Sequence, residues 1–105
     1  MLSAILSKYL IYKEKTMRAV ITVIGKDMVG ILAKVSVKCA ENNINVLEVT
    51  QSILQDMFAM IMMVDISKAS VPFTDFAEDL EKMGKEMNLS IHAMHEDIFN
   101  AMHTI

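Results

Sequence analysis

The sequence predicts an α+β domain in which two helices cover one face of a four-stranded antiparallel sheet. Three observations carry this prediction: four runs rich in apolar and β-branched residues, two amphipathic stretches of helical period, and the order in which they alternate. The order is strand, helix, strand, strand, helix, strand, which is typical of the ferredoxin-like βαββαβ sandwich. A short C-terminal helix is expected after the last strand.

The first strand is expected over residues 17–24, where "MRAVITVI" is apolar and β-branched. The loop "GKDMVGIL", residues 25–32, leads into a helix expected from about 29 to 43. The pair Asn42-Asn43 suits the C-terminal end of that helix. On a 3.6-residue wheel, one apolar face of the helix is expected to reach the core, and it contains Val29, Leu32, Ala33, Ser36, Cys39 and Ala40.

Two strand-like runs follow, over residues 45–54 and 58–67, and the Gln55-Asp56-Met57 spacing between them predicts a hairpin. In the expected topology the second of these runs and the first strand are central, and two helices cover only one face. The uncovered face is therefore expected to be closed by the tail helix or by a second copy of the chain. Both alternating sets of the second run are apolar: Phe58, Met60, Met62, Val64 and Ile66, and Ala59, Ile61 and Met63.

A second helix is expected over about residues 75–87, after a loop that contains Pro72. A fourth strand over 89–96 and a tail helix over 97–105 complete the prediction. The apolar residues of the second helix form one stripe expected to be core: Phe73, Phe76, Ala77, Leu80, Met83, Gly84 and Met87. The tail is too short to be stable alone, and the residues expected to dock it are Ile98, Ala101, Met102 and Ile105.

Length and composition restrict the class of protein. A chain of 105 residues suits one domain with one core, and we expect it to span residues 17–105, tail helix included. A net charge of −3 argues against a nucleic-acid partner, because no basic excess is available to neutralise phosphates. No apolar run is long enough to cross a bilayer, so no membrane association is expected. The single cysteine, Cys39, suits a reducing cytoplasm.

The opening segment "MLSAILSKYLIYKEKT", residues 1–16, is apolar but does not read as a signal peptide. Lys8 interrupts it, no basic region precedes the apolar run, and no small-residue cleavage site follows. We expect an N-terminal extension, either from an upstream start codon or as a cloning remnant. An amphipathic helix that docks on a partner is the functional alternative.

The loop between the first strand and the first helix is the best candidate for a ligand site. The first backbone N–H groups of a helix have no intrahelical acceptor, so a ligand carboxylate could accept from those near Val29 to Leu32, where the helix dipole also favours an anion. Asp27 would attract an ammonium group, and Gly30 permits close approach of a ligand. Asn45 offers both an amide donor and an acceptor. The alternative is a plain turn, in which Asp27 only caps the helix and Gly30 only serves packing.

Patterns of known catalytic and metal sites are not matched. The loop is not a P-loop, because Ile31-Leu32 stand where Lys-Ser/Thr is required. His92 and His95 are three apart on an expected strand and so point to opposite faces, which disfavours a shared metal. Cys39 lies on the expected buried face of the helix, opposite Lys38, and no histidine is near it in the sequence. We therefore expect no catalytic residue, no metal and no cofactor, and a protein that is not an enzyme.

Two motifs resemble the signature of ACT domains. Asp27-Met28-Val29-Gly30-Ile31-Leu32 follows a strand, and Ile44-Asn45-Val46 follows the helix, with Asn45 fifteen residues after Gly30. The resemblance spans residues 17 to about 96. With "VIGKD-VGI" at its start and "HEDIFNAMH" at its end, the chain is similar to small stand-alone ACT-domain proteins of uncharacterised function. Similar domains begin formyltetrahydrofolate deformylases and occur in glycine-cleavage repressors. The chain departs from the usual pattern at Val29, where many ACT domains carry proline.

The resemblance implies a non-enzymatic regulatory protein that binds a small molecule, usually an amino acid, between two copies of the domain. It implies a ligand site at Asp27, Met28, Val29, Gly30, Ile31 and Asn45, and a homo-oligomer, dimer or tetramer, that acts on an associated enzyme. The alternative is a structural protein-interaction module on the same fold that binds no metabolite. An acylphosphatase-like enzyme is disfavoured because the loop has no arginine, and an RNA-binding protein because Phe58 is the sole aromatic on the expected central strands.

Overall fold

The computed structural model describes residues 17–26 and 29–102. The elements of this part follow the predicted order. They are β1 (Arg18–Gly25), α2 (Ile31–Glu41), β2 (Asn45–Leu54), β3 (Met57–Asp65), α3 (Phe73–Glu86), β4 (Ser90–His95) and α4 (Glu96–Met102). The expected bounds agree to within two residues at most ends, and β2 agrees at both.

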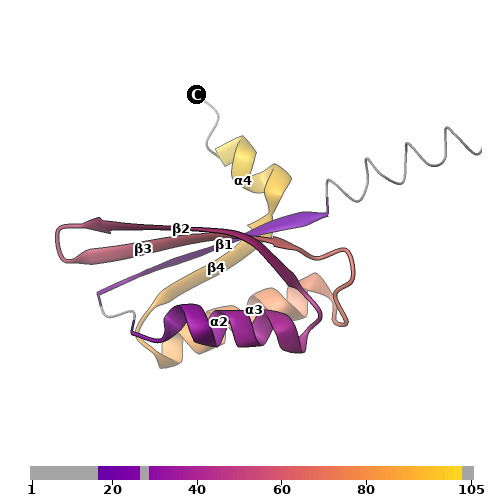
Figure 1. Cartoon of the computed structure of the whole chain (residues 1–105), viewed down its shortest axis with the longest axis horizontal. Helices are drawn as coiled ribbons and strands as arrows, with labels where there is room; N and C mark the ends of the chain where they lie inside the picture. Colours follow the sequence, from indigo (N-terminus) through magenta and orange to yellow (C-terminus); the bar gives the residue numbers. More distant parts are fainter. Residues whose placement is uncertain (1–16, 27–28, 103–105) are drawn as a thin grey trace, which may run out of the picture.

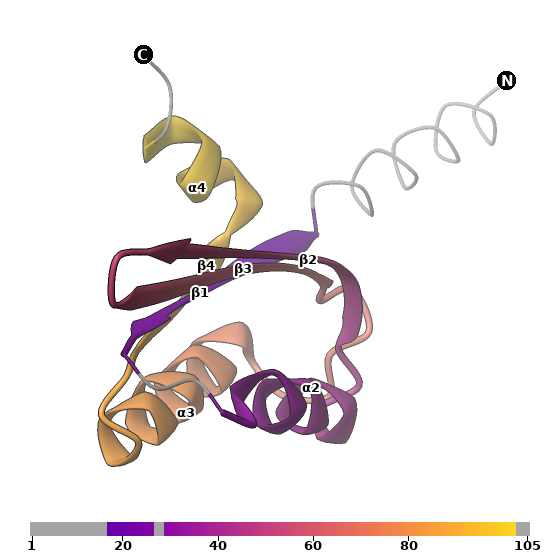
Figure 2. The same cartoon turned by 60° about the vertical axis from the view of Figure 1, so that its left-hand side comes forward.

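The four strands form one antiparallel sheet in the order β2-β3-β1-β4, so β1 and β3 are central as expected. Helices α2 and α3 lie together on one side of this sheet, whereas α4 rises from the other side (Figures 1 and 2). The ferredoxin-like sandwich predicted from the sequence is confirmed. Among the described residues, no helix is long and apolar enough to cross a membrane.

The core lies between the sheet and the helices α2 and α3. The first apolar set of β3 faces it, with Met60, Met62 and Val64 almost fully buried. The predicted stripe of α3 is also confirmed, because Phe76, Leu80 and Gly84 are buried. The remaining residues of that stripe pack half-buried around them.

The core-facing side predicted for α2 was wrong. The residues that α2 buries are Ile31, Val35 and Cys39, of which only Cys39 was expected. Val29 precedes the helix and is 89% exposed, and Leu32 is 38% exposed. The physical reason is that α2 carries apolar residues on two sides, and helical periodicity does not say which of them meets the sheet.

Asparagines end both long helices through the same backbone motif. Asn43, with φ 58°, follows α2, and the Ile44 N–H donates to the Cys39 carbonyl at 2.8 Å. Asn88, with φ 62°, ends α3 in the same way. This is the Schellman arrangement, in which a left-handed residue lets the chain turn back at once. The predicted C-terminal role of Asn42-Asn43 is confirmed.

The β2–β3 hairpin has a tighter turn and a less regular ladder than expected. Met57 pairs with Leu54, so the turn consists of Gln55 and Asp56 alone. A β-bulge between Val46 and Glu48 then shifts the register by one residue. As a result Asn45 lies opposite Asp65.

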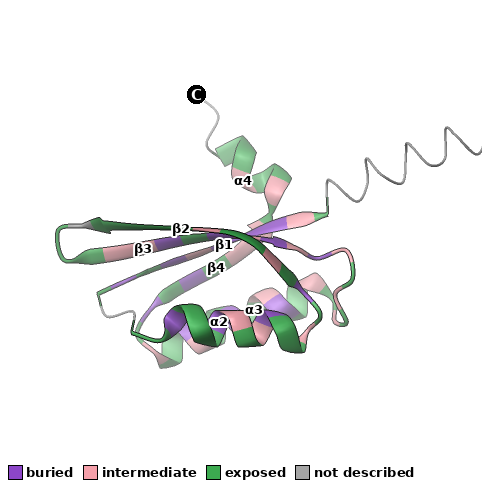
Figure 3. Ribbon diagram, in the orientation of Figure 1, coloured by how far each residue is buried: buried purple, intermediate pink, exposed green. Residues whose placement is uncertain are grey.

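The tail helix α4 is attached to the sheet by an ion pair at its first residue. The Arg18 guanidinium donates two hydrogen bonds to the Glu96 carboxylate, at 2.8 Å from Nε and 2.6 Å from Nη2. The residues expected to dock the helix do not do so, because Ile98 and Met102 are 53% and 67% exposed. No described residue of α4 is buried, and its ribbon is accordingly green and pink in Figure 3. Ile105 lies outside the described residues.

Candidate functional site

The residues predicted to form the ligand site lie at the two ends of α2. Val29, Gly30 and Ile31 are at its N-terminal end, and Asn45 begins β2 just beyond its C-terminal end (Figure 1). Asp27 and Met28 lie outside the described residues. Because α2 has 11 residues, its two ends are separated by about 16 Å. One chain therefore does not bring the two halves of the predicted site together.

Gly30 has a backbone conformation that favours glycine. Its φ of 76° is left-handed, and an added Cβ would meet nothing within 4 Å. The glycine therefore serves the turn into α2 rather than close packing. As the residue before the helix it offers no side-chain cap, so the first backbone amides of α2 depend on other partners. Ile31 is 2% exposed, so its side chain belongs to the core rather than to a ligand site.

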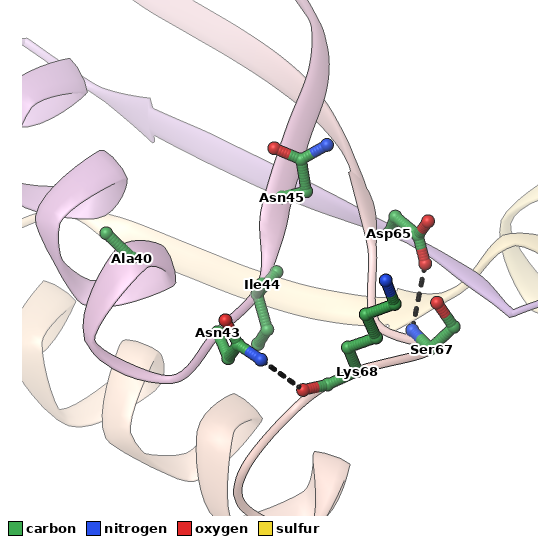
Figure 4. A pocket seen from close by; sticks show the side chains of 7 residues that line it. All are labelled: Ala40, Asn43, Ile44, Asn45, Asp65, Ser67 and Lys68. Atoms are coloured by element: carbon green, nitrogen blue, oxygen red, sulfur yellow. Dashed lines mark hydrogen bonds between the residues drawn. The ribbon is translucent and has the colours of Figure 1, made fainter.

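The Asn45 end is an open polar hollow of about 470 Å³. Figure 4 shows the side chains of Asn45, Asp65 and Lys68 around it, together with Asn43 and Ser67. They come from two stretches of chain. One is the turn after α2 with the start of β2, and the other is the end of β3 with the turn that follows it. The hollow thus gathers an anion, a cation and amide groups beside the C-terminal end of α2.

Hydrogen bonds order the floor of this hollow. The Ser67 N–H donates to Asp65 Oδ1 at 2.8 Å, and Asn43 Nδ2 donates to the Lys68 carbonyl at 3.0 Å. Donation from Ser67, backbone and side chain, lowers the pKa of Asp65 below its ordinary value, and the charges of Lys68 and Arg18 add to the effect. Asp65 therefore stays ionised in a site that also offers the ammonium of Lys68.

Asp65, Ser67 and Lys68 were missed in the sequence. One signal for these residues was available, because the apolar run of β3 ends in a polar stretch. In the predicted hairpin, that stretch lies opposite the start of β2. A regular hairpin would have placed Asn45 one residue out of register with β3. The bulge near Leu47 that corrects the register cannot be recognised from the sequence. Sequence reasoning could therefore reach the neighbourhood of Asn45 but not its partners.

One side of α2 borders the open edge of the sheet. Leu32, Ser36 and Ala40 recur every four residues, and Ala40 lines the hollow beside Asn45. We call these three residues the α2 flank. By contrast, Val37 lines a shallow groove with Met83 of α3 on the other side of the helix. The flank carries one leucine, one serine and one alanine, and it lies on the side of β2, which is an edge strand of the sheet formed by the described residues.

His92, His95 and Cys39 have local roles in the part of the chain that the structure describes. His92 lies 3.5 Å from the Glu81 carboxylate and 3.4 Å from the Ser90 hydroxyl. The His95 ring packs against the Phe73 ring, with the centroids 4.4 Å apart and the planes tilted by 40°. Within residues 17–26 and 29–102, no group of three or more metal-binding side chains is assembled. Burial raises the pKa of Cys39 to about 11, which keeps its thiol protonated and unreactive.

The arrangement of strands and helices defines a ferredoxin-like domain whose polar hollow lies outside its core. A model of the ACT domain matches residues 17–94, and the chain belongs to the ACT domain family. It is 49% identical over 88 residues to a UPF0237 protein of Methanocaldococcus jannaschii, a match covering 84% of this chain and 98% of that protein. It is 51% identical over 89 residues to a UPF0237 protein of Listeria innocua, covering 85% and 100%.

Solved structures agree with this assignment. An ACT domain protein from Streptococcus pneumoniae is 34% identical with a TM-score of 0.69, covering 86% of this chain and 98% of that one. A formyltetrahydrofolate deformylase from Pseudomonas syringae is 20% identical with a TM-score of 0.66, covering 90% and 32%, and supports the fold alone. ACT domains are generally regulatory domains that bind small molecules.

Proposed function

We propose that this protein is a homodimeric sensor that binds an amino acid between two copies and regulates an enzyme with which it associates. The observation that carries the proposal is the position of Gly30 and Asn45 at opposite ends of α2. A free amino acid is much shorter than the roughly 16 Å between these ends. A site that uses both ends therefore needs two chains.

The fold suggests how two chains would supply such a site. If the β2 edges of two copies pair antiparallel about a two-fold axis, the neighbouring α2 helices also run antiparallel. The Gly30 end of one helix then lies beside the Asn45 hollow of the other. Both α2 flanks meet in this arrangement, and residues as small as Ser36 and Ala40 allow the two helices to approach closely.

The two halves complement the charges of a zwitterion. The first amides of α2 and the helix dipole suit the ligand carboxylate. Asp65, ionised at neutral pH, suits the ammonium group, as does Asp27 if the loop approaches the ligand. Asn45 is exposed at the hollow, and its side-chain amide can hydrogen-bond to both the carboxylate and the ammonium group of the ligand. The side chain of the ligand would contact the α2 flank.

A thermal-shift panel of the standard amino acids and folate-pathway metabolites tests whether a ligand binds at all. We expect one chemical class to raise the melting temperature in proportion to its concentration, because a ligand that binds only the folded state stabilises it. A flat response to the whole panel at millimolar concentration contradicts sensing. It would instead support a protein-interaction module on the same fold.

Asn45→Ala tests the role of the amide with the ligand found in that panel. Loss of one neutral hydrogen bond is expected to weaken binding by about 0.5–1.5 kcal/mol, measured by calorimetry. The melting temperature without ligand should stay the same, because Asn45 is exposed. Unchanged affinity removes Asn45 from the site.

Mixing two variants tests whether the site is shared. Gly30→Asp places a negative charge where the ligand carboxylate is expected. The left-handed φ of this position strains any side chain, but Asp adopts it more readily than most residues, and circular dichroism checks that the variant is folded. Gly30→Asp and Asn45→Ala should each bind more weakly than the parent when tested alone, Asn45→Ala by the loss expected above. After the two are unfolded and refolded together, hybrid dimers contain one intact site, so part of the binding should return. No recovery in the mixture contradicts a shared site.

A further inference from the structure

The polar hollow beside the C-terminal end of α2 contains a cation that the ligand contacts proposed above leave unused. A neutral amino acid would place its carboxylate at the first amides of α2 in one copy and its ammonium group at Asp65 of the other. Lys68 also lines the hollow, and it is exposed. Within the described part of the chain, Lys68 forms no ion pair. The hollow therefore offers one further positive charge to a ligand.

Hydrogen bonds hold the turn that carries Lys68 against the end of α2. Asn43 Nδ2 donates to the Lys68 carbonyl at 3.0 Å. Two residues further on, the Ser70 N–H donates to the Asn42 carbonyl at 2.9 Å. The backbone of Lys68 is thus already ordered, and only its side-chain torsions lose freedom when the ammonium group binds an anion.

The side chain of Lys68 extends along the hollow. Figure 4 shows it running from the turn toward Asp65 and the start of β2. The positive charge of Lys68 is also one of the causes that lower the pKa of Asp65. The two charges are thus close without a direct ion pair. A ligand anion beside Lys68 would complete an alternating row of ligand ammonium, Asp65, Lys68 and ligand anion, in which each charge has a neighbour of opposite sign.

The lining of the hollow favours a polar ligand side chain. Five of its seven lining residues are polar or charged, and the other two are Ala40 and Ile44. Ile44 is 4% exposed, so it offers almost no apolar surface. Ala40 belongs to the α2 flank, so a ligand side chain that passes the flank there ends among polar groups. The volume of about 470 Å³ lies within the usual range for small-molecule sites.

We propose that the ligand is an amino acid with an anionic side chain, such as aspartate or glutamate, and that Lys68 binds the side-chain anion. This inference rests on the proposed function, because it assigns the third charged group of the same ligand. The carboxylate and ammonium groups of the ligand backbone are common to all amino acids. Lys68 is therefore the residue that selects among them.

Binding of two matched pairs of amino acids, measured by calorimetry at neutral pH, tests the proposal. Glutamate and glutamine, like aspartate and asparagine, have nearly the same shape but differ in side-chain charge. We expect the acidic member of at least one pair to bind the parent about 5- to 10-fold more tightly than its amide, because a charge-assisted hydrogen bond at an open site adds on that order. Added KCl should reduce this preference.

Three variants locate the preference. Lys68→Gln should remove it and leave the affinity for the amide unchanged, whereas Lys68→Arg keeps the charge and should keep the preference. Lys82→Gln is the matched control, because Lys82 is exposed on α3 and does not line the hollow. It removes the same charge from the chain and should bind both members of each pair as the parent does.

The contrary outcomes overturn different claims. Amides that bind the parent as tightly as the acids overturn the ligand class and leave the sensor function standing. A preference that survives Lys68→Gln overturns the role of Lys68, and so does a preference that Lys82→Gln also removes. If no amino acid binds the parent, the proposed function fails and this inference fails with it.

Discussion

Helices α2 and α3 lie side by side on the same sheet but use their surfaces differently. The apolar residues of α3 form one stripe, and that stripe is buried against the sheet. Those of α2 lie on more than one side: Ile31, Val35 and Cys39 face the core, whereas Leu32 and Ala40 on the flank are exposed, as is Val37 on the side toward Met83. A helix that only supports the core needs one apolar side. The second side of α2 indicates a helix that also meets something outside its own domain.

Phe76→Ala should produce the largest effect, because Phe76 is the largest fully buried side chain and belongs to α3. We expect a loss of about 3–5 kcal/mol in the free energy of unfolding, measured by urea denaturation. Ile53→Ala is the control, because a substitution at so exposed a position should change stability by less than about 0.5 kcal/mol. Similar values for the two variants would mean that the α3 stripe is not the core.

Ser36→Glu on the α2 flank should dissociate the dimer with little effect on the fold. The two-fold axis brings the two new carboxylates near each other, and such like-charge contacts oppose association by several kcal/mol. Val37→Glu introduces the same charge one position away, on the side that faces Met83, and should leave the dimer intact. Sedimentation of both variants distinguishes them. Equal behaviour would show that the flank has no special role.

Gly84→Ala should destabilise α3 where it crosses β4. An added Cβ would lie 2.9 Å from the Leu89 carbonyl oxygen and from Ile91 Cγ1, so the helix must move away from the sheet. We expect a cost of about 1–3 kcal/mol in thermal or urea unfolding. Ala40→Gly in α2 is the comparison: it removes no core contact and should cost only the helix propensity, about 1 kcal/mol.

The smallest effect is expected from Asp65→Asn beside the end of α2. Because the pKa of Asp65 is lowered in the folded state, its contribution to stability is complete above the ordinary value of 3.8 and is lost as pH falls through the lower folded value. Parent and variant should therefore differ most at neutral pH, by about 0.5 kcal/mol or less for so open a site. Melting curves that keep a constant separation into strong acid contradict this.

The sequence was sufficient for the element order, the central strands and the core stripe of α3, because each has a single clear period. It was insufficient for α2, where two apolar sides fit the same periodicity. The pairing of Asn45 with Asp65 depends on a bulge, and the Arg18–Glu96 pair joins positions 78 residues apart. Such contacts follow from the three-dimensional arrangement rather than from local pattern. The roles of Val29, Gly30 and Asn45 in binding a ligand stay predictions.

The central claim is that two copies pair along β2 and α2 and so unite the two ends of the ligand site. Sedimentation equilibrium of the parent at micromolar concentration tests it most directly. The account predicts a species of twice the 11.8 kDa chain mass that Ser36→Glu converts to single chains. A parent that sediments as one 11.8 kDa chain, with Asn45-dependent ligand binding intact, would contradict it.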